Sequence, residues 1–97
     1  MHEGGPVTNI VKVGARRRPE PFDKHKLQQS IVAACLSAGA PIGQAESIAR
    51  SVAVDVAEWL QTRPEVTSHD LRRIAAKRLR VHHPDAGYLY EQHRSTL

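Results

Sequence analysis

Cysteine and aromatic residues are scarce in this chain of 97 residues. Cys35 is the only cysteine, which excludes an internal disulfide and a zinc site built from several thiolates. We expect a buried and inert thiol, because Cys35 lies within the apolar run 31–36. Aromatic residues make up only 4% of the chain, so the core must be aliphatic and rich in alanine. That composition favours helices.

The chain also lacks the sequence patterns that would assign it to several large classes. No apolar run is long enough to cross a membrane, and residues 1–6 do not form a signal peptide, so we expect a cytoplasmic location. Neither common glycine-rich phosphate loop is present, and no serine or cysteine lies in a recognisable nucleophile motif. The histidines lack the spacing of zinc ligands and are expected in exposed loops. We therefore predict a protein that is not an enzyme.

Positive charge is in moderate excess, with 14 Lys and Arg against 10 Asp and Glu. The net charge of +4 permits binding to nucleic acid, nucleotides or acidic proteins, and selects none of them. Two basic segments, 16–18 and 72–80, are candidates for contacts with a nucleic-acid backbone. A charged hairpin tip and a solvated helix face are the simpler interpretations of the same segments.

The length predicts a single domain, which we place at residues 8–94 between a flexible tail at 1–7 and a frayed end at 95–97. The β-branched residues of segment 8–13 predict a strand, Gly14 a turn, and the prolines at 19 and 21 an edge strand on the return. Segment 65–67 is a candidate third strand.

Four helices are predicted from capping residues and apolar spacing. The first begins after Asp23 as N-cap, with Phe22 as a hydrophobic staple, and ends at Gly39. The second runs from about residue 43 to 62, with Trp59 in the core; the third follows Thr67, and the fourth begins at Pro84. The predicted fold class is α+β and mostly α. It is a four-helix bundle capped by a small three-stranded sheet, formed by the N-terminal hairpin and the strand between helices two and three.

A candidate ligand site lies where the hairpin enters the first helix. Long helical side chains lean toward the helix N-terminus, so Lys26 should reach back to the junction and meet Lys12 from the neighbouring strand. Two ammonium groups at a helix N-terminus suit phosphate. Glu20 and Asp23 would repel phosphate, and should instead accept hydrogen bonds from sugar hydroxyls or a base amino group, which favours adenine over guanine.

A simpler interpretation of the same residues remains open. Asp23 can be only an N-cap, Lys26 a solvated helix residue, and Glu20 and Lys12 a surface ion pair. On the sequence pattern alone this interpretation is the more common outcome.

Three segments of the chain resemble the ATP-cone domain, the regulatory nucleotide-binding module of many ribonucleotide reductases and of the bacterial repressor of their genes. The segments are Ile10-Val11-Lys12-Val13-Gly14, Glu20-Pro21-Phe22-Asp23-Lys24-His25-Lys26-Leu27 and Val66-Thr67-Ser68-His69-Asp70-Leu71. Segment 84–90 also looks like the family's last helix. The resemblance implies a helical bundle capped by a small sheet, with ATP or dATP bound under the hairpin, accompanied by Mg²⁺.

Matched by position, the resemblance also implies roles for single residues. Lys12 and Lys26 would contact phosphates, and Glu20 and Asp23 the base or sugar. An adenine slot would be lined by Val11, Phe22 and Leu27. Val13 stands at a nucleotide-binding position where the family usually has arginine, and the hairpin turn is two residues longer with the triple arginine inside it. Arg72 falls about where some relatives place a histidine that contacts the nucleotide, and the last helix ends early.

The leading prediction is thus a non-catalytic sensor of adenine nucleotides that acts through a partner or through self-association. A reductase would continue into a catalytic domain with several cysteines, and the repressor would begin with a four-cysteine zinc ribbon. We therefore expect a free-standing or excised cone, whose partner in trans would be a ribonucleotide reductase or another regulated protein. The alternatives are a basic nucleic-acid-binding domain and a structural protein-interaction module with a degenerate pocket.

Overall fold

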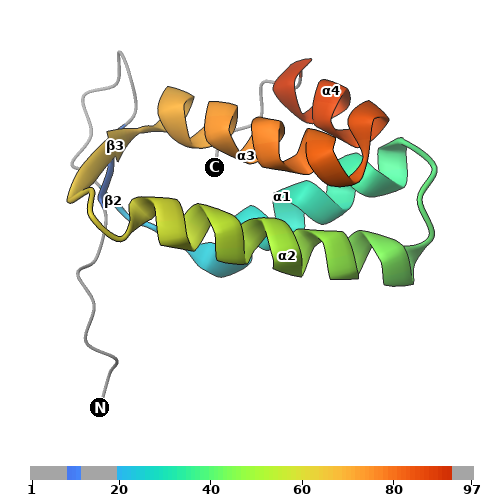
Figure 1. The fold of residues 1–97 in the computed structure, drawn as a ribbon, viewed down its shortest axis with the longest axis horizontal. Coiled ribbons are helices and arrows are strands. Elements are labelled where there is room, and N and C mark those ends of the chain that lie inside the picture. Colours follow the sequence, from blue (N-terminus) through green and yellow to red (C-terminus); the bar gives the residue numbers. More distant parts are fainter. Residues whose placement is uncertain (1–8, 12–19, 93–97) are drawn as a thin grey trace.

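Four helices and a small sheet make up the fold in the computed structural model, which describes residues 9–11 and 20–92 (Figure 1). The predicted mostly helical α+β class is confirmed, and the helix ends fall within about two residues of the expected ones. In chain order the elements are β1 (Asn9–Val11), β2 (Glu20–Pro21), α1 (Lys24–Ser37), α2 (Ile42–Leu60), β3 (Glu65–Thr67), α3 (Ser68–His82) and α4 (Pro84–Gln92).

The sheet connects the N-terminal strand to the middle of the chain. β1 pairs with β3 in parallel, with Ile10 opposite Val66, and it pairs antiparallel with β2 over two positions. Pro21 lies in β2 at the edge, where its missing N–H is tolerated. The predicted turn at Gly14 and the triple arginine lie outside the described residues. Because β2 leads into α1 and β3 into α3, the sheet holds the first turns of these two helices beside β1.

The helix ends have the local causes that the sequence indicates. Asp23 caps α1 through its carboxylate, and the Thr67 hydroxyl caps α3 by accepting from the N–H of Asp70 at 3.0 Å. α1 ends in a Schellman motif, in which the N–H of Ala40 donates to the carbonyl of Cys35 and Gly39 takes a φ of 91°. Glycine adopts that left-handed conformation without strain.

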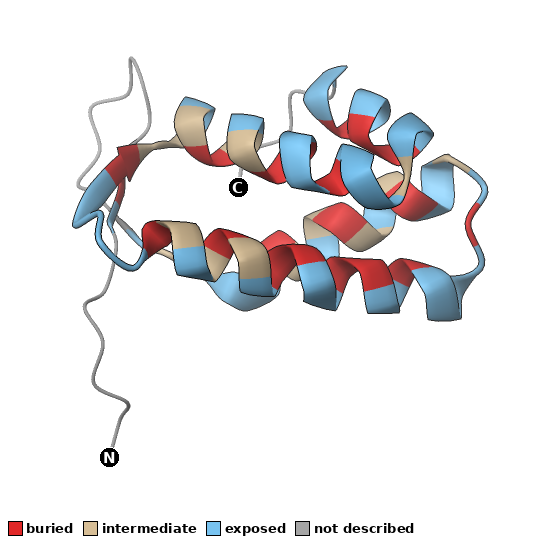
Figure 2. Cartoon of the chain, in the orientation of Figure 1, coloured by how far each residue is buried: buried red, intermediate tan, exposed pale blue. Residues whose placement is uncertain are grey.

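The core is aliphatic and lies between the helices, with one buried face contributed by each of α1, α2 and α3 (Figure 2). Leu27, Ile31 and Cys35 form the buried face of α1. Burial raises the pKa of the Cys35 thiol, which agrees with an inert cysteine. Trp59 differs from the expectation of a core residue: it is half-buried, and the guanidinium of Arg63 lies 4.4 Å from its ring centroid. The indole therefore packs at the edge of the core, and its ring also contacts the guanidinium of Arg63.

α3 and α4 form a close pair held by three different contacts. Gly87 of α4 lies directly against the backbone of Arg80, and the Arg80 guanidinium pairs with the Glu91 carboxylate. His83 caps α4, since its Nδ1 accepts from the N–H of Ala86 at 3.2 Å. The expectation of exposed loop histidines is therefore wrong here: His82 is the last residue of α3, and His83 is a half-buried cap.

Tyr90 connects α4 to α1. It is only 5% exposed, and its hydroxyl lies 3.1 Å from the Ser30 hydroxyl. Burial raises the pKa of Tyr90 to about 12, although the bond to Ser30 and the positive charge of Arg72 act in the opposite direction. The folded state therefore holds the phenol proton more tightly than the unfolded chain does.

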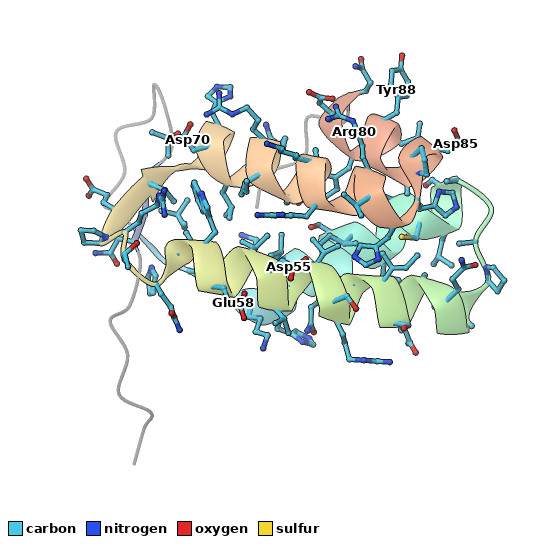
Figure 3. The ribbon with its side chains drawn as sticks, in the orientation of Figure 1. Asp55, Glu58, Asp70, Arg80, Asp85 and Tyr88 are labelled. Atoms are coloured by element: carbon cyan, nitrogen blue, oxygen red, sulfur yellow. The ribbon has the colours of Figure 1, made fainter. Side chains whose placement is uncertain are left out.

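The raised pKa of Tyr90 makes the free energy of unfolding fall at alkaline pH. The unfolded phenol ionises near pH 10, so the contribution of Tyr90 is intact below about pH 10 and is lost as pH rises toward 12. We expect a loss of up to about 2.7 kcal/mol in the free energy of unfolding over that interval. Tyr90→Phe should flatten this dependence, as measured by urea unfolding between pH 9 and pH 11.5. Tyr88, which is 59% exposed and points away from the bundle (Figure 3), supplies the control Tyr88→Phe. If the free energy of unfolding had the same pH dependence in Tyr90→Phe and in wild type, the alkaline loss of stability could not come from Tyr90.

Candidate functional site

A pocket of about 580 Å³ lies where the sheet meets the first turn of α1. Its volume is within the usual range for small-molecule sites. Side chains from β1, the β2–α1 junction, α1 and α3 line it, namely Ile10, Pro21, Phe22, Asp23, Lys24, His25, Lys26, Leu27 and Leu71. The pocket thus draws on segments that are far apart in sequence and that the parallel β1–β3 pairing brings together.

The lining of the pocket contains an apolar set and a charged set of side chains. Ile10, Leu27 and Leu71 are buried, and Phe22 is half-buried against the core. The four residues 23–26 are all exposed. A flat apolar group such as a nucleobase suits the apolar side chains, and an anion suits the basic ones.

Asp23 has one carboxylate oxygen committed to the helix. Its Oδ1 accepts from the backbone N–H of His25 at 3.0 Å and of Lys26 at 3.2 Å. These bonds cap the N-terminus of α1 and hold the carboxylate in the lining of the pocket. Oδ2 takes no part in these two capping bonds, so the residue can cap the helix and also accept a hydrogen bond from a ligand.

Three basic residues in succession occupy the first turn of α1. Lys24, His25 and Lys26 all line the pocket, and the turn contains no acidic residue. Cations are unfavourable at this end of a helix, because the free N–H groups and the macrodipole already make it positive. The arrangement concentrates positive potential at the pocket mouth, and a bound anion would relieve the repulsion.

The structure brings together four of the residues predicted from the sequence. Phe22, Asp23, Lys26 and Leu27 line the one pocket. Lys12 and Val13 lie outside the described residues, as do the side chains of Val11 and Glu20, whose backbones take part in β1 and β2. The nucleotide contacts predicted for these four residues stay predictions.

Arg72 does not line the pocket; its neighbour Leu71 does. Arg72 is half-buried, and its charge acts on Tyr90 of α4. Sequence reasoning missed the remaining lining residues. Lys24 and His25 were detectable, because they follow the N-cap directly and must lie in the first turn. Ile10 and Leu71 were not, because only the tertiary pairing of β1 with β3 brings them to the pocket.

Two basic residues of α3 lie in ion pairs. Arg73 pairs with Asp70 at 2.8 Å, and Arg80 pairs with Glu91, so acids partly neutralise the charge of this helix. This pairing weakens the interpretation of the helix as a nucleic-acid-binding face. Within residues 9–11 and 20–92, no group of three or more metal-ligating side chains occurs, and no helix has the length and apolar character of a membrane span.

Comparison with known families identifies the class of protein that this fold and pocket define. A family model described as the ATP cone domain matches residues 13–92, which is most of the chain. The chain therefore belongs to the ATP-cone family, whose domains are regulatory, non-catalytic modules that bind adenine nucleotides. Searches of curated proteins and of solved structures give no match.

Proposed function

We propose that this chain binds ATP or dATP in the pocket at the start of α1 and acts as a regulatory module without catalytic activity of its own. The observation that carries the proposal is the pocket itself, which is lined by apolar side chains, by the basic residues Lys24, His25 and Lys26, and by the Asp23 carboxylate. A nucleotide has the matching parts, with an apolar base, a neutral sugar and an anionic tail. The ATP-cone family match supports the same ligand class.

Different side chains of the pocket recognise different parts of the nucleotide. Lys26 binds the phosphates, together with Lys12. Ile10, Leu27 and Leu71 hold the base, and burying a base face against them is favourable without specifying which base it is. Asp23 Oδ2 accepts from the adenine amino group or a ribose hydroxyl, a role that Glu20 shares. Guanine presents a carbonyl oxygen where adenine has its amino group, and a carboxylate disfavours that oxygen.

The sheet transmits occupancy of the pocket to the rest of the molecule. β1 contributes Ile10 to the pocket and also pairs with β3, which leads into α3. A nucleotide that contacts β1, α1 and α3 together would hold the sheet over the helix ends as a cap. A ligand shifts an arrangement only when it binds that arrangement better, and a nucleotide bridging these elements meets this condition.

The output of this module is a changed surface offered to a partner. We propose that the partner is a ribonucleotide reductase or another regulated protein in trans, or a second copy of the chain, in the cytoplasm. Mg²⁺ would accompany the triphosphate and reduce the repulsion between its charge and Asp23.

Thermal unfolding with different nucleotides tests the proposal. A ligand that binds only the folded state stabilises it by about 1.4 kcal/mol at ten times its Kd, which raises the Tm of a domain this size by roughly 5–10 °C. We expect such shifts with ATP and dATP, and smaller ones with GTP at equal concentration. The measurement is differential scanning fluorimetry with and without Mg²⁺, followed by calorimetric titration.

The nucleotide series separates two failures. Equal shifts with ATP and GTP would show that Asp23 and Glu20 do not read the base, although the pocket would still bind triphosphates. No shift with any nucleotide would overturn the proposed function.

A further inference from the structure

We propose that His25 is a further phosphate-contacting side chain of the pocket and that nucleotide binding is therefore coupled to protonation of its imidazole. This inference rests on the proposed function, and it adds a regulatory input that the binding residues alone do not supply. It predicts that the affinity of this domain for adenine nucleotide depends on pH.

His25 lies at the boundary between two cavities. It lines the nucleotide pocket, and it also lines a second groove of about 570 Å³ between α1 and α2. The other residues of that groove include Gln28, Gln29, Glu46 and Arg50. Among the residues that line the two cavities, His25 is the one they share.

Protonation gives the His25 ring a charge and a second donor. Its Nε2 lies 3.2 Å from Nε2 of Gln29, so one ring nitrogen has a partner on α1. A neutral imidazole carries one N–H, whereas the charged ring carries an N–H on both nitrogens. Nδ1–H can then donate to a phosphate oxygen while Gln29, whose amide offers an oxygen as well as a nitrogen, stays bonded to Nε2. The charged ring also places a positive charge beside the phosphates, which the neutral ring does not.

Charged side chains of both signs surround His25. On α1 it has Asp23, Lys24 and Lys26 as neighbours, and across the groove α2 presents Glu46 and Arg50. The pocket residues from β1 and α3, Ile10 and Leu71, are apolar and contribute no charge. A bound triphosphate adds negative charge on the pocket side and favours the charged ring.

The linkage has a definite sign. Imidazole changes charge between about pH 5 and 8, and the protonated form binds phosphate better. Lower pH should therefore tighten nucleotide binding, and binding should take up protons from the buffer. An exposed charge pair of this kind is worth up to about 1 kcal/mol, so roughly a fivefold change in affinity should depend on His25.

The test is calorimetric titration of the full chain with ATP and Mg²⁺ at pH 5.5, 6.5 and 7.5, in pairs of buffers with different ionisation heats. His25→Gln keeps a polar side chain of similar reach but cannot be charged. His82→Gln is the matched control, because His82 is an exposed histidine at the far end of α3 and lies outside both cavities. The ATP phosphates also titrate in this range, but equally for all three proteins, so only differences between them are interpreted.

We expect the ratio of the His25→Gln Kd to the wild-type Kd to rise roughly fivefold from pH 7.5 to pH 5.5. We also expect the proton uptake at pH 6.5 to fall in His25→Gln and to remain in His82→Gln. ATP binding with the same pH dependence and proton uptake in wild type and His25→Gln would overturn this inference and leave the proposed function standing. Absence of any binding heat with wild type at all three pH values would overturn both.

Discussion

Gly87→Ala should lower the free energy of unfolding by about 2–3 kcal/mol, enough to reduce the Tm by roughly 10–20 °C. A Cβ at this position would lie 2.4 Å from Cγ of Arg80, and 2.9 Å from both its Cα and its backbone nitrogen. The side chain could move aside, but the backbone of α3 could not, so α4 would have to withdraw. Withdrawal would also weaken the ion pair between Arg80 and Glu91 and the buried contact of Tyr90 with Ser30.

Helix propensity alone predicts the opposite sign, since alanine is favoured over glycine inside a helix by up to about 1 kcal/mol. Gly43→Ala is the matched control, because Gly43 is also helical and a Cβ there meets nothing within 4 Å. Urea and thermal unfolding of both variants should show Gly43→Ala at or above wild-type stability and Gly87→Ala far below it. If Gly87→Ala were as stable as wild type, α3 and α4 could not be packed as closely as described.

Lys26→Ala should weaken ATP binding by about ten- to a hundredfold, because a charge-assisted phosphate contact is worth roughly 1.5–3 kcal/mol. The same substitution should leave the unliganded protein as stable as wild type, or slightly more stable. Lys26 is exposed in the first turn of α1, where its charge opposes the helix macrodipole. Loss of binding without loss of stability is the signature of a ligand-binding side chain rather than a structural one.

Lys77→Ala is the control for this prediction, since Lys77 is an exposed lysine of α3 that does not line the pocket. Calorimetric titration with ATP and dATP gives the affinities, and thermal unfolding without ligand gives the stabilities. Unchanged affinity in Lys26→Ala would place the phosphates elsewhere. A parallel loss of affinity in Lys77→Ala would point instead to a general effect of net charge, which added salt should then mimic.

Features with local causes could be predicted from the sequence. Asp23 and Thr67 cap helices because a short acceptor side chain precedes each apolar pattern, and Gly39 ends α1 because few other residues adopt its φ. The pocket residues Phe22, Asp23, Lys26 and Leu27 follow from the same logic, since one helical turn fixes their relative positions.

Features that depend on two distant elements could not be predicted. Nothing near Gly87 indicates that Arg80 lies against it, and nothing near Ser30 indicates a bond to Tyr90. Arg72 illustrates the limit most clearly. Its position in the sequence suggested the ligand site, whereas the rotation of α3 places Leu71 at the pocket and directs the charge of Arg72 toward Tyr90. The orientation of α3 about its own axis therefore determines whether Leu71 or Arg72 lines the pocket.

The parallel pairing of Asn9 with Glu65 sets an order of assembly. During synthesis β1 leaves the ribosome first, yet its partner emerges only after all of α1 and α2 has been made. Closing so long a loop is unfavourable until the intervening helices have packed and shortened it. We therefore expect the cavity beside Ile10 to be completed only after the intervening helices have packed and β1 has paired with β3.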